Sequence, residues 1–171
     1  MSIDITIEGK RVGTGQIFTD IERTHKVDVS GYQMIIRSKG FDDAVFTVTR
    51  DTAYSLAHPE HRYKTNGECP PSKDGEPYHA RIRTDGPRGY RLELYEPSLC
   101  IDRSPNLLQG TGQVPRTSIQ IHKGPGYTQG CFSIMPDKAE HERFCSVLHA
   151  MMEGSDASIT VTVKPREVEQ L

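Results

Sequence analysis

Hydrophobic and polar residues alternate in short runs over the first fifty residues, which is the pattern of β-strands with one buried face. The runs cover residues 3–7, 26–29, 32–36 and 45–49. Turns are expected at 13–15 and 38–40, because glycine interrupts the alternation there. Residues 1–50 are therefore predicted to form a β-meander, either as a separate N-terminal segment or as part of the same domain as the rest of the chain.

Residues 57–79 lose this alternation and contain four prolines and many charged residues. A stretch of this length without periodicity predicts a long loop, which is either a lid or binding loop or a disordered segment. After it, 80–83 and 90–94 alternate again on either side of a turn-rich connector, which predicts a β-hairpin. A second loop is expected over 97–115.

A helical period occurs once, over residues 138–152. The apolar side chains that repeat at helical spacing are Phe144, Val147, Leu148 and Met151. Asp137 is the expected N-cap and Gly154 the expected C-cap. Residues 157–163 alternate as a last strand, and 165–171 are expected to be a frayed tail. The fold class predicted is mostly β, with one main C-terminal helix.

Composition and charge narrow the possible partners. The chain has 171 residues, 35% of them hydrophobic and 26% charged, which suits one compact domain. A formal net charge of −2 gives no electrostatic reason to expect nucleic acid or an anionic membrane as a partner. No run is long enough for a membrane span, and no secretory signal is visible at the N-terminus, so synthesis in the cytoplasm without signal-directed export is expected.

The candidate chemistry is concentrated in residues 116–134. His122 ends one apolar run, a Gly/Pro-rich loop follows, and Gly130 and Cys131 precede a second apolar run. A strand-loop-strand unit of this kind would place a thiol beside an imidazole that can take its proton. Glycine before the cysteine allows backbone N–H groups to approach a developing oxyanion. The competing interpretations are a buried inert thiol at Cys131 and a strand-end histidine bonded to a backbone carbonyl.

The other cysteines and histidines give weaker indications of a functional site. Cys69, Cys100 and Cys145 are expected to be reduced, packed thiols, because no Cys-x-x-Cys motif occurs. A zinc site from His58, His61, Cys69 and His79 matches no ligand spacing, so solvated loop residues are favoured. His141 and His149 are expected on the exposed face of the helix. The arginines of the predicted hairpin, Arg81, Arg83, Arg88 and Arg91, are interpreted as a solvated face or as a carboxylate or phosphate site.

His122, the loop behind it and Thr128-x-Gly130-Cys131 followed by an apolar residue resemble the signature of the L,D-transpeptidase (YkuD-like) family. The resemblance covers roughly residues 90–163 and is similar to the small, often phage-associated branch of that superfamily. Three positions depart from the signature. Lys123 stands where the family has glycine, Ser133 where it has arginine, and Gln129 where many members have a second histidine.

The resemblance implies a YkuD-like β-sandwich or barrel, with a catalytic domain over 51–171. It implies a cysteine acyltransferase in which Cys131 attacks a carbonyl of a peptidoglycan stem peptide or muropeptide and forms a thioester, with His122 as base. The N–H groups of Gly130 and Cys131 would bind the oxyanion, and no metal or other cofactor is implied. The expected substrate contacts are Thr128, Gln129, Ser133, Lys123 and Arg116.

Two other functions stay open at this stage. One is a Cys/His amidase that acts on another peptide, and the other is a catalytically inactive module that binds peptides or cell wall. Transpeptidase and carboxypeptidase are equally compatible with the resemblance. Because peptidoglycan lies outside the cytoplasm, the interpretation requires delivery by a phage particle, lysis or a contact-dependent secretion system, or a cytoplasmic role on recycled wall peptides.

Overall fold

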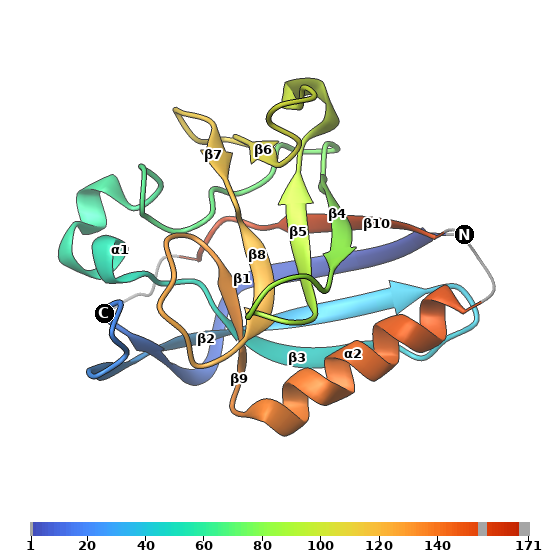
Figure 1. Cartoon of the computed structure of the whole chain (residues 1–171), viewed down its shortest axis with the longest axis horizontal. Helices are drawn as coiled ribbons and strands as arrows, with labels where there is room; N and C mark the ends of the chain where they lie inside the picture. The colour runs from blue at the N-terminus through green and yellow to red at the C-terminus, as the bar shows by residue number, and fades with distance from the viewer. Residues whose placement is uncertain (1, 154–156, 168–171) are drawn as a thin grey trace.

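The computed structural model describes residues 2–153 and 157–167. Its body is a closed barrel in which eight strands follow one another in the order β1-β10-β4-β5-β8-β9-β3-β2. The barrel strands are β1 (Ser2–Phe18), β2 (Lys26–Ser38), β3 (Ala44–Thr49), β4 (Tyr78–Arg83), β5 (Arg91–Tyr95), β8 (Gln120–Lys123), β9 (Phe132–Met135) and β10 (Ser158–Val163). In Figure 1, β4, β5 and β8 stand upright across the nearly horizontal β1, β2, β3 and β10. The mostly β fold class is confirmed.

The N-terminal strands belong to this barrel. β1 pairs in parallel with β10, and β3 pairs with β9, so residues from both ends of the chain close the same sheet. Ile3, Ile5 and Ile7 are fully buried in the hydrophobic cluster that also contains Val161 and Val163. Residues 2–50 and the rest of the chain thus share one core.

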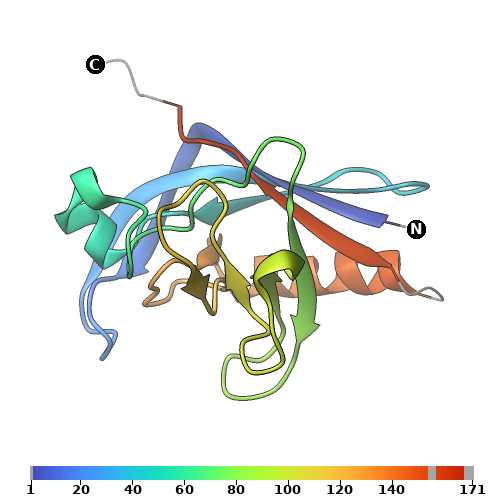
Figure 2. The ribbon, with the colours of Figure 1, turned by 90° about the horizontal axis from the view of Figure 1, so that it is seen from above.

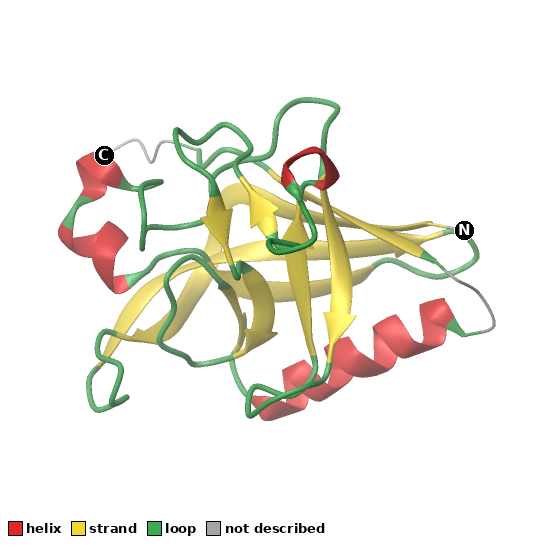
Figure 3. Cartoon of the chain, turned by 45° about the horizontal axis from the view of Figure 1, so that its top comes forward, coloured by secondary structure: helices red, strands yellow, loops and turns green. Residues whose placement is uncertain are grey.

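Helix α2 (Lys138–Met152) follows the predicted range, and Asp137 caps it by accepting a hydrogen bond from the Glu140 N–H at 3.2 Å. Its apolar side packs on β9, β3 and β8. Phe144 meets Phe46 of β3 edge to face, with ring centroids 5.7 Å apart. Figures 2 and 3 show the helix lying alongside the strands. The expected C-cap, Gly154, lies outside the described residues.

Short elements fill the connections. They are α1 (Ala53–Ala57), two 3₁₀ turns (Pro59–His61 and Pro97–Leu99) and a two-stranded sheet of β6 (Leu107–Leu108) and β7 (Arg116–Thr117). The predicted hairpin is confirmed, because β4 and β5 pair antiparallel from His79 with Tyr95 to Arg83 with Arg91. Among the described residues, no helix is both long and apolar enough to cross a membrane.

The two turn predictions in the N-terminal region have different outcomes. The turn at 38–40 is confirmed, since β2 ends at Ser38 and a turn follows. The turn at 13–15 is wrong, because β1 continues to Phe18 with register shifts near Arg11. A Cβ at Gly15 would lie 2.6 Å from Cγ2 of Thr49, so this glycine permits close strand packing at a bend. The runs 26–29 and 32–36 likewise belong to the single strand β2.

The loop over 57–79 and the C-terminal tail are more tightly packed than the sequence suggests. Residues 67–72 are buried, with Glu68 fully so, which excludes the disordered interpretation for that part. Arg166 forms ion pairs with Asp51, at 2.6 Å, and with Glu68. The prediction of a frayed tail is therefore wrong for residues 165–167, because buried carboxylates hold the arginine there. Residues 168–171 lie outside the described part.

Candidate functional site

The parallel pair of β8 and β9 places the two candidate catalytic residues on one face of the sheet. Ile121 lies opposite Phe132, and His122 lies opposite Ser133. Because side chains alternate along a strand, His122 shares its face with Cys131, one position before β9, while Ile121 and Phe132 point to the core. Both apolar residues are fully or almost fully buried. The pattern of apolar residues on either side of the loop is thus what sets the imidazole and the thiol on the same side.

His122 is held by its own strand. Its Nδ1 lies 2.7 Å from the carbonyl oxygen of Lys123. A carbonyl can only accept, so Nδ1 carries the proton and Nε2 keeps its lone pair. Burial lowers the pKa of His122 to about 4; the bond to Lys123 opposes this shift, and the positive charge of Arg88 adds to it. At neutral pH the ring is therefore an uncharged base.

Cys131 is also buried, with 5% of its surface exposed. Its thiol donates a hydrogen bond to the Ser118 carbonyl oxygen at 3.3 Å. Burial raises the pKa of the thiol, although the backbone N–H of Gln120 and the guanidinium of Arg88 lower it in part. The resting state is accordingly a neutral thiol with a neutral imidazole on the same face, without a preformed ion pair.

Two buried side chains shape the loop that carries the thiol. The Thr128 hydroxyl donates to the Cys131 carbonyl oxygen and accepts from the Gly130 N–H, both at 3.3 Å. Arg116 donates to the carbonyl oxygen of Gln129 at 2.6 Å. Gly130 has φ +128°, and a Cβ there would lie 2.8 Å from Nη2 of Arg116, so only glycine fits.

These bonds change the roles expected of the loop residues. Thr128 and Arg116 are engaged by the protein itself and hold this loop in place, and both also line a cavity beside Cys131, so their expected substrate contact stays a prediction. The Gly130 N–H is already donated to Thr128, so the N–H of Cys131 is left as the candidate oxyanion donor.

Two neighbouring cavities open at this face. Cys131 lines the larger, of about 460 Å³, together with Thr128 and Gln129. His122 and Lys123 line the smaller, of about 200 Å³. The residues that line both are Arg23, Arg88 and Tyr127. Gln129 and Lys123 thus lie where a ligand could touch them.

Ser133 lines neither of these cavities, which argues against its expected substrate contact. It is fully buried, and its Oγ has no hydrogen-bond partner within the described residues. The loop behind His122 covers it, since a Cβ at Gly124 would lie 2.9 Å from Cβ of Ser133. The position that carries arginine in the resembling family therefore points into packed protein here.

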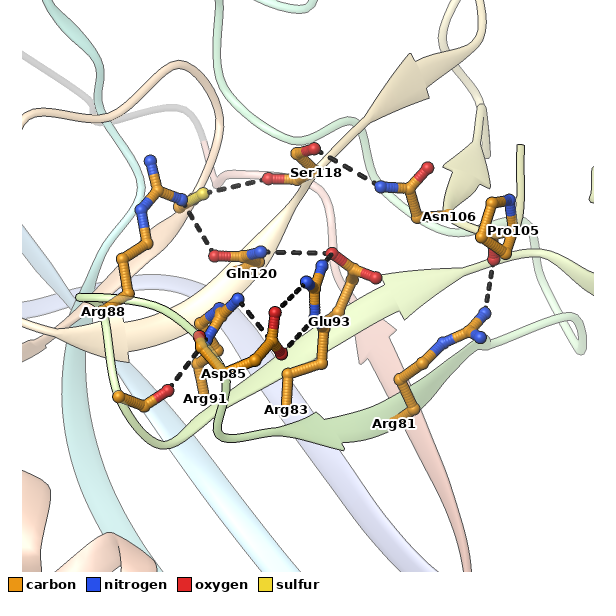
Figure 4. Close-up of polar contacts among 12 residues, drawn as sticks. Arg81, Arg83, Asp85, Arg88, Arg91, Glu93, Pro105, Asn106, Ser118 and Gln120 are labelled. Atoms are coloured by element: carbon orange, nitrogen blue, oxygen red, sulfur yellow. Dashed lines mark hydrogen bonds and ion pairs between the residues drawn. The ribbon is translucent and has the colours of Figure 1, made fainter. Parts of the chain in front are cut away.

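The basic hairpin differs from expectation in part, and the helical histidine does so fully. Arg91 is buried against backbone carbonyls, whereas Arg83, which pairs with Asp85 and Glu93, is half-buried and Arg88 is exposed, so the solvated-face interpretation fails for Arg91 alone (Figure 4). The prediction that His141 is exposed is wrong. It is 8% exposed, and its Nε2 lies 2.9 Å from the Tyr90 carbonyl oxygen. The described residues contain no group of three or more His, Cys, Asp or Glu side chains placed to hold a metal.

Sequence reasoning missed several residues near the thiol. Gln120 is one of them, although it precedes His122 by two positions and the alternation predicts that both share a face. Arg23 carries no local signal, because it reaches the cavities from the turn between β1 and β2. Comparison with protein-family models, with curated proteins and with solved structures finds no match to this chain.

Proposed function

We propose that this protein is a cysteine acyltransferase or peptidase that acts on peptidoglycan stem peptides, as an L,D-transpeptidase or L,D-carboxypeptidase. The observation that carries the proposal is the register of β8 and β9, which places His122 on the sheet face beside Cys131. The bond from His122 Nδ1 to the Lys123 carbonyl leaves Nε2 as the basic atom, and it is also the bond expected of a structural strand-end histidine. A nucleophile, a base and a group that orients the base are the parts that nucleophilic catalysis needs. The peptidoglycan substrate rests on the resemblance carried by His122, Thr128, Gly130 and Cys131.

With a neutral thiol and a neutral imidazole at rest, the thiol proton has to be removed as the thiol attacks. As Sγ of Cys131 attacks the substrate carbonyl carbon, Nε2 of His122 takes the thiol proton, and the carbonyl oxygen gains negative charge near the Cys131 N–H. The imidazolium then gives its proton to the leaving amine, which departs with formation of a thioester. Water or an acceptor amine next attacks the thioester and releases Cys131. The low pKa of His122 makes its imidazolium a strong acid for the leaving group and its neutral imidazole a weak base for the first step.

A second candidate is a module that binds peptides without turnover. The raised pKa of Cys131 and the burial of Ser133 favour it, because neither assists attack on a carbonyl. Under either proposal the target lies outside the cytoplasm or among recycled wall peptides. For a target outside the cytoplasm, the proposal includes delivery by a phage particle, lysis or a secretion system.

Release of D-alanine from a purified muropeptide tetrapeptide separates the two candidates. We expect release by the wild type and none by Cys131→Ala or His122→Ala, while Cys100→Ala serves as the matched control and keeps activity. Circular dichroism and thermal unfolding check that each variant is folded. Release that persists in either active-site variant rules out the assignment, and binding without release by the wild type favours the binding module.

A further inference from the structure

The two cavities beside Cys131 and His122 have a one-sided charge. Every charged residue that lines them is basic: Arg23, Arg88, Arg116 and Lys123. The chain as a whole has 23 acidic residues against 21 basic ones, so this lining is a local departure from its composition. A concave surface with charge of one sign concentrates ligands of the opposite sign.

Arg23 and Arg88 are the arginines common to both cavities, and both are exposed. Arg23 lies in the turn between β1 and β2, and Arg88 lies in the turn between β4 and β5. Within the described part of the chain, neither forms an ion pair with a carboxylate. Of the two nearest acids before Arg23 in the sequence, Glu22 forms no ion pair with it in the described part of the chain, and Asp20 is bonded instead to Thr24 and the backbone N–H of His25.

A buried network holds Arg88 in place (Figure 4). Nη1 of Arg88 donates to Oε1 of Gln120 at 2.9 Å, and Nε2 of Gln120 donates to Oε2 of Glu93 at 3.1 Å. Arg83 also donates to that carboxylate oxygen, at 2.8 Å. Because Glu93 can only accept when ionised, it fixes which end of the Gln120 amide faces Arg88. Gln120 and Glu93 are 3% and 2% exposed, so the groups that hold Arg88 are themselves fixed by the surrounding protein.

The other hairpin arginines lack this freedom. Arg83 and Arg91 contact Asp85, and Arg81 donates to the Pro105 carbonyl oxygen and stacks on the Tyr95 ring. Among the described residues, Arg88 donates a hydrogen bond only through Nη1, so Nε and Nη2 are available to a ligand. A planar guanidinium with two free donors suits a carboxylate.

We propose that Arg23 and Arg88 form an anion-recognition pair that binds a carboxylate of the ligand beside Cys131. The catalytic consequence rests on the proposed function: the preferred substrate has a free carboxylate close to the carbonyl that Cys131 attacks, as in a peptide whose terminal residue is the leaving group. A peptide with the same terminal residue as an amide binds more weakly.

The pair is tested with two alkylating agents that differ in charge. Iodoacetate and iodoacetamide both form a C–S bond with a thiolate and release iodide, and only the first carries a carboxylate. Peptide mass spectrometry gives the two rates at each cysteine, and their ratio cancels the intrinsic reactivity of the thiol. We expect the iodoacetate-to-iodoacetamide ratio to be about tenfold higher at Cys131 than at Cys100, which lies outside these cavities.

Variants assign the effect to the two arginines. Arg23→Gln and Arg88→Gln each lower the ratio at Cys131 by about threefold, and the double variant brings it close to the ratio at Cys100, since Arg116 and Lys123 remain. Arg103→Gln removes the same charge from an exposed position away from the cavities and leaves the ratio unchanged. A ratio at Cys131 no higher than at Cys100, or one that both variants leave unchanged, overturns the proposal.

A parallel NMR titration covers the case in which neither agent reaches the buried thiol. N-acetylglycine should shift the backbone amide signals of Arg23, Arg88 and Cys131, while N-acetylglycinamide should not, and equal shifts or none with both probes overturn the proposal. Neither experiment requires turnover. Anion selectivity without D-alanine release would therefore support the arginine pair and contradict the proposed function. D-alanine release without anion selectivity would support the proposed function and contradict the pair.

Discussion

Nη2 of Arg116 lies 2.6 Å from the carbonyl oxygen of Gln129, two residues before Cys131. The same guanidinium donates to the carbonyl oxygens of Gly67 and Glu68, at 2.8 and 3.2 Å. One buried side chain thus ties the loop that carries the thiol to the loop that follows α1. Within residues 2–153 and 157–167, the hydrogen-bond partners of this Arg116 guanidinium are all backbone carbonyls, and the position of the thiol depends on them.

Arg116→Lys should destabilise the protein, although it keeps the charge. An ammonium group is a point donor and cannot reach carbonyls that lie on different sides of a planar fork. Loss of two hydrogen bonds to a charged group predicts a decrease of about 3–6 kcal/mol in the free energy of unfolding, measured by urea denaturation. Arg103→Lys is the exposed control, and equal stability of the two variants would contradict this role for Arg116.

Arg166→Met should be more damaging than an ordinary surface change. It removes the ion pairs with Glu68, which is fully buried, and with Asp51. A buried carboxylate that loses its ion-pair partner predicts a loss of up to about 3–5 kcal/mol in the free energy of unfolding, and the nearby charge of Arg50 offsets part of it. Adding Glu68→Gln should restore part of it, because the charge that lacks a partner is gone.

Lys164→Met provides the control for the tail, since Lys164 pairs with Glu8 at 3.2 Å while half exposed. That change should cost less than about 1 kcal/mol. If Arg166→Met costs no more than Lys164→Met, the tail is not held in the way the ion pairs indicate.

Ser133 offers a test of the departure from the family signature. Ser133→Ala should leave the free energy of unfolding unchanged or raise it by up to about 1 kcal/mol, because the hydroxyl is buried without a partner among the described residues. Ser133→Arg, which introduces the residue that the resembling family has at this position, should lower the free energy of unfolding by more than about 3 kcal/mol by burying an unpaired charge. Wild-type stability of Ser133→Arg in urea would show instead that this side chain reaches a cavity.

Local signals predicted the elements that depend on neighbours in sequence. The limits of α2 follow from Asp137 and from apolar residues at helical spacing, which are properties of one segment. The same spacing places His141 on the buried face, three positions before Phe144. Its burial could therefore have been predicted from the sequence. The face shared by His122 and Cys131 followed likewise from alternation on both sides of the loop.

What the sequence could not predict depends on contacts between distant segments. From the sequence alone, Gly15 is typical of a turn. Only its contact with Thr49 of β3 shows that it lies within a strand. Arg166 has carboxylate partners 98 and 115 positions away, so nothing near it distinguishes it from a frayed tail. Arg23 and Arg88 meet at the cavities only because two turns of the closed barrel converge there.

His122 should make folding stability depend on pH. Its pKa is about 4 in the folded protein, below the ordinary 6.5, so the unfolded chain binds more protons between these values. The contribution is fully present above pH 6.5 and is lost as the pH falls toward 4. A difference of this size corresponds to about 3 kcal/mol. Urea denaturation at several pH values should show this loss in the wild type and a flatter curve in His122→Asn.

The raised pKa of Cys131 predicts how its reactivity depends on pH. Near neutral pH the thiol is protonated, so iodoacetamide should modify Cys131 no faster than the partly exposed Cys100. Its rate should rise only above the ordinary pKa of 9.0, because burial favours the neutral form. The ultraviolet absorbance of thiolate, taken as the difference between the wild type and Cys131→Ser, measures the same titration without a reagent. A difference already present at neutral pH would mean that His122 and Cys131 form an ion pair at rest, and catalysis would then begin from a thiolate.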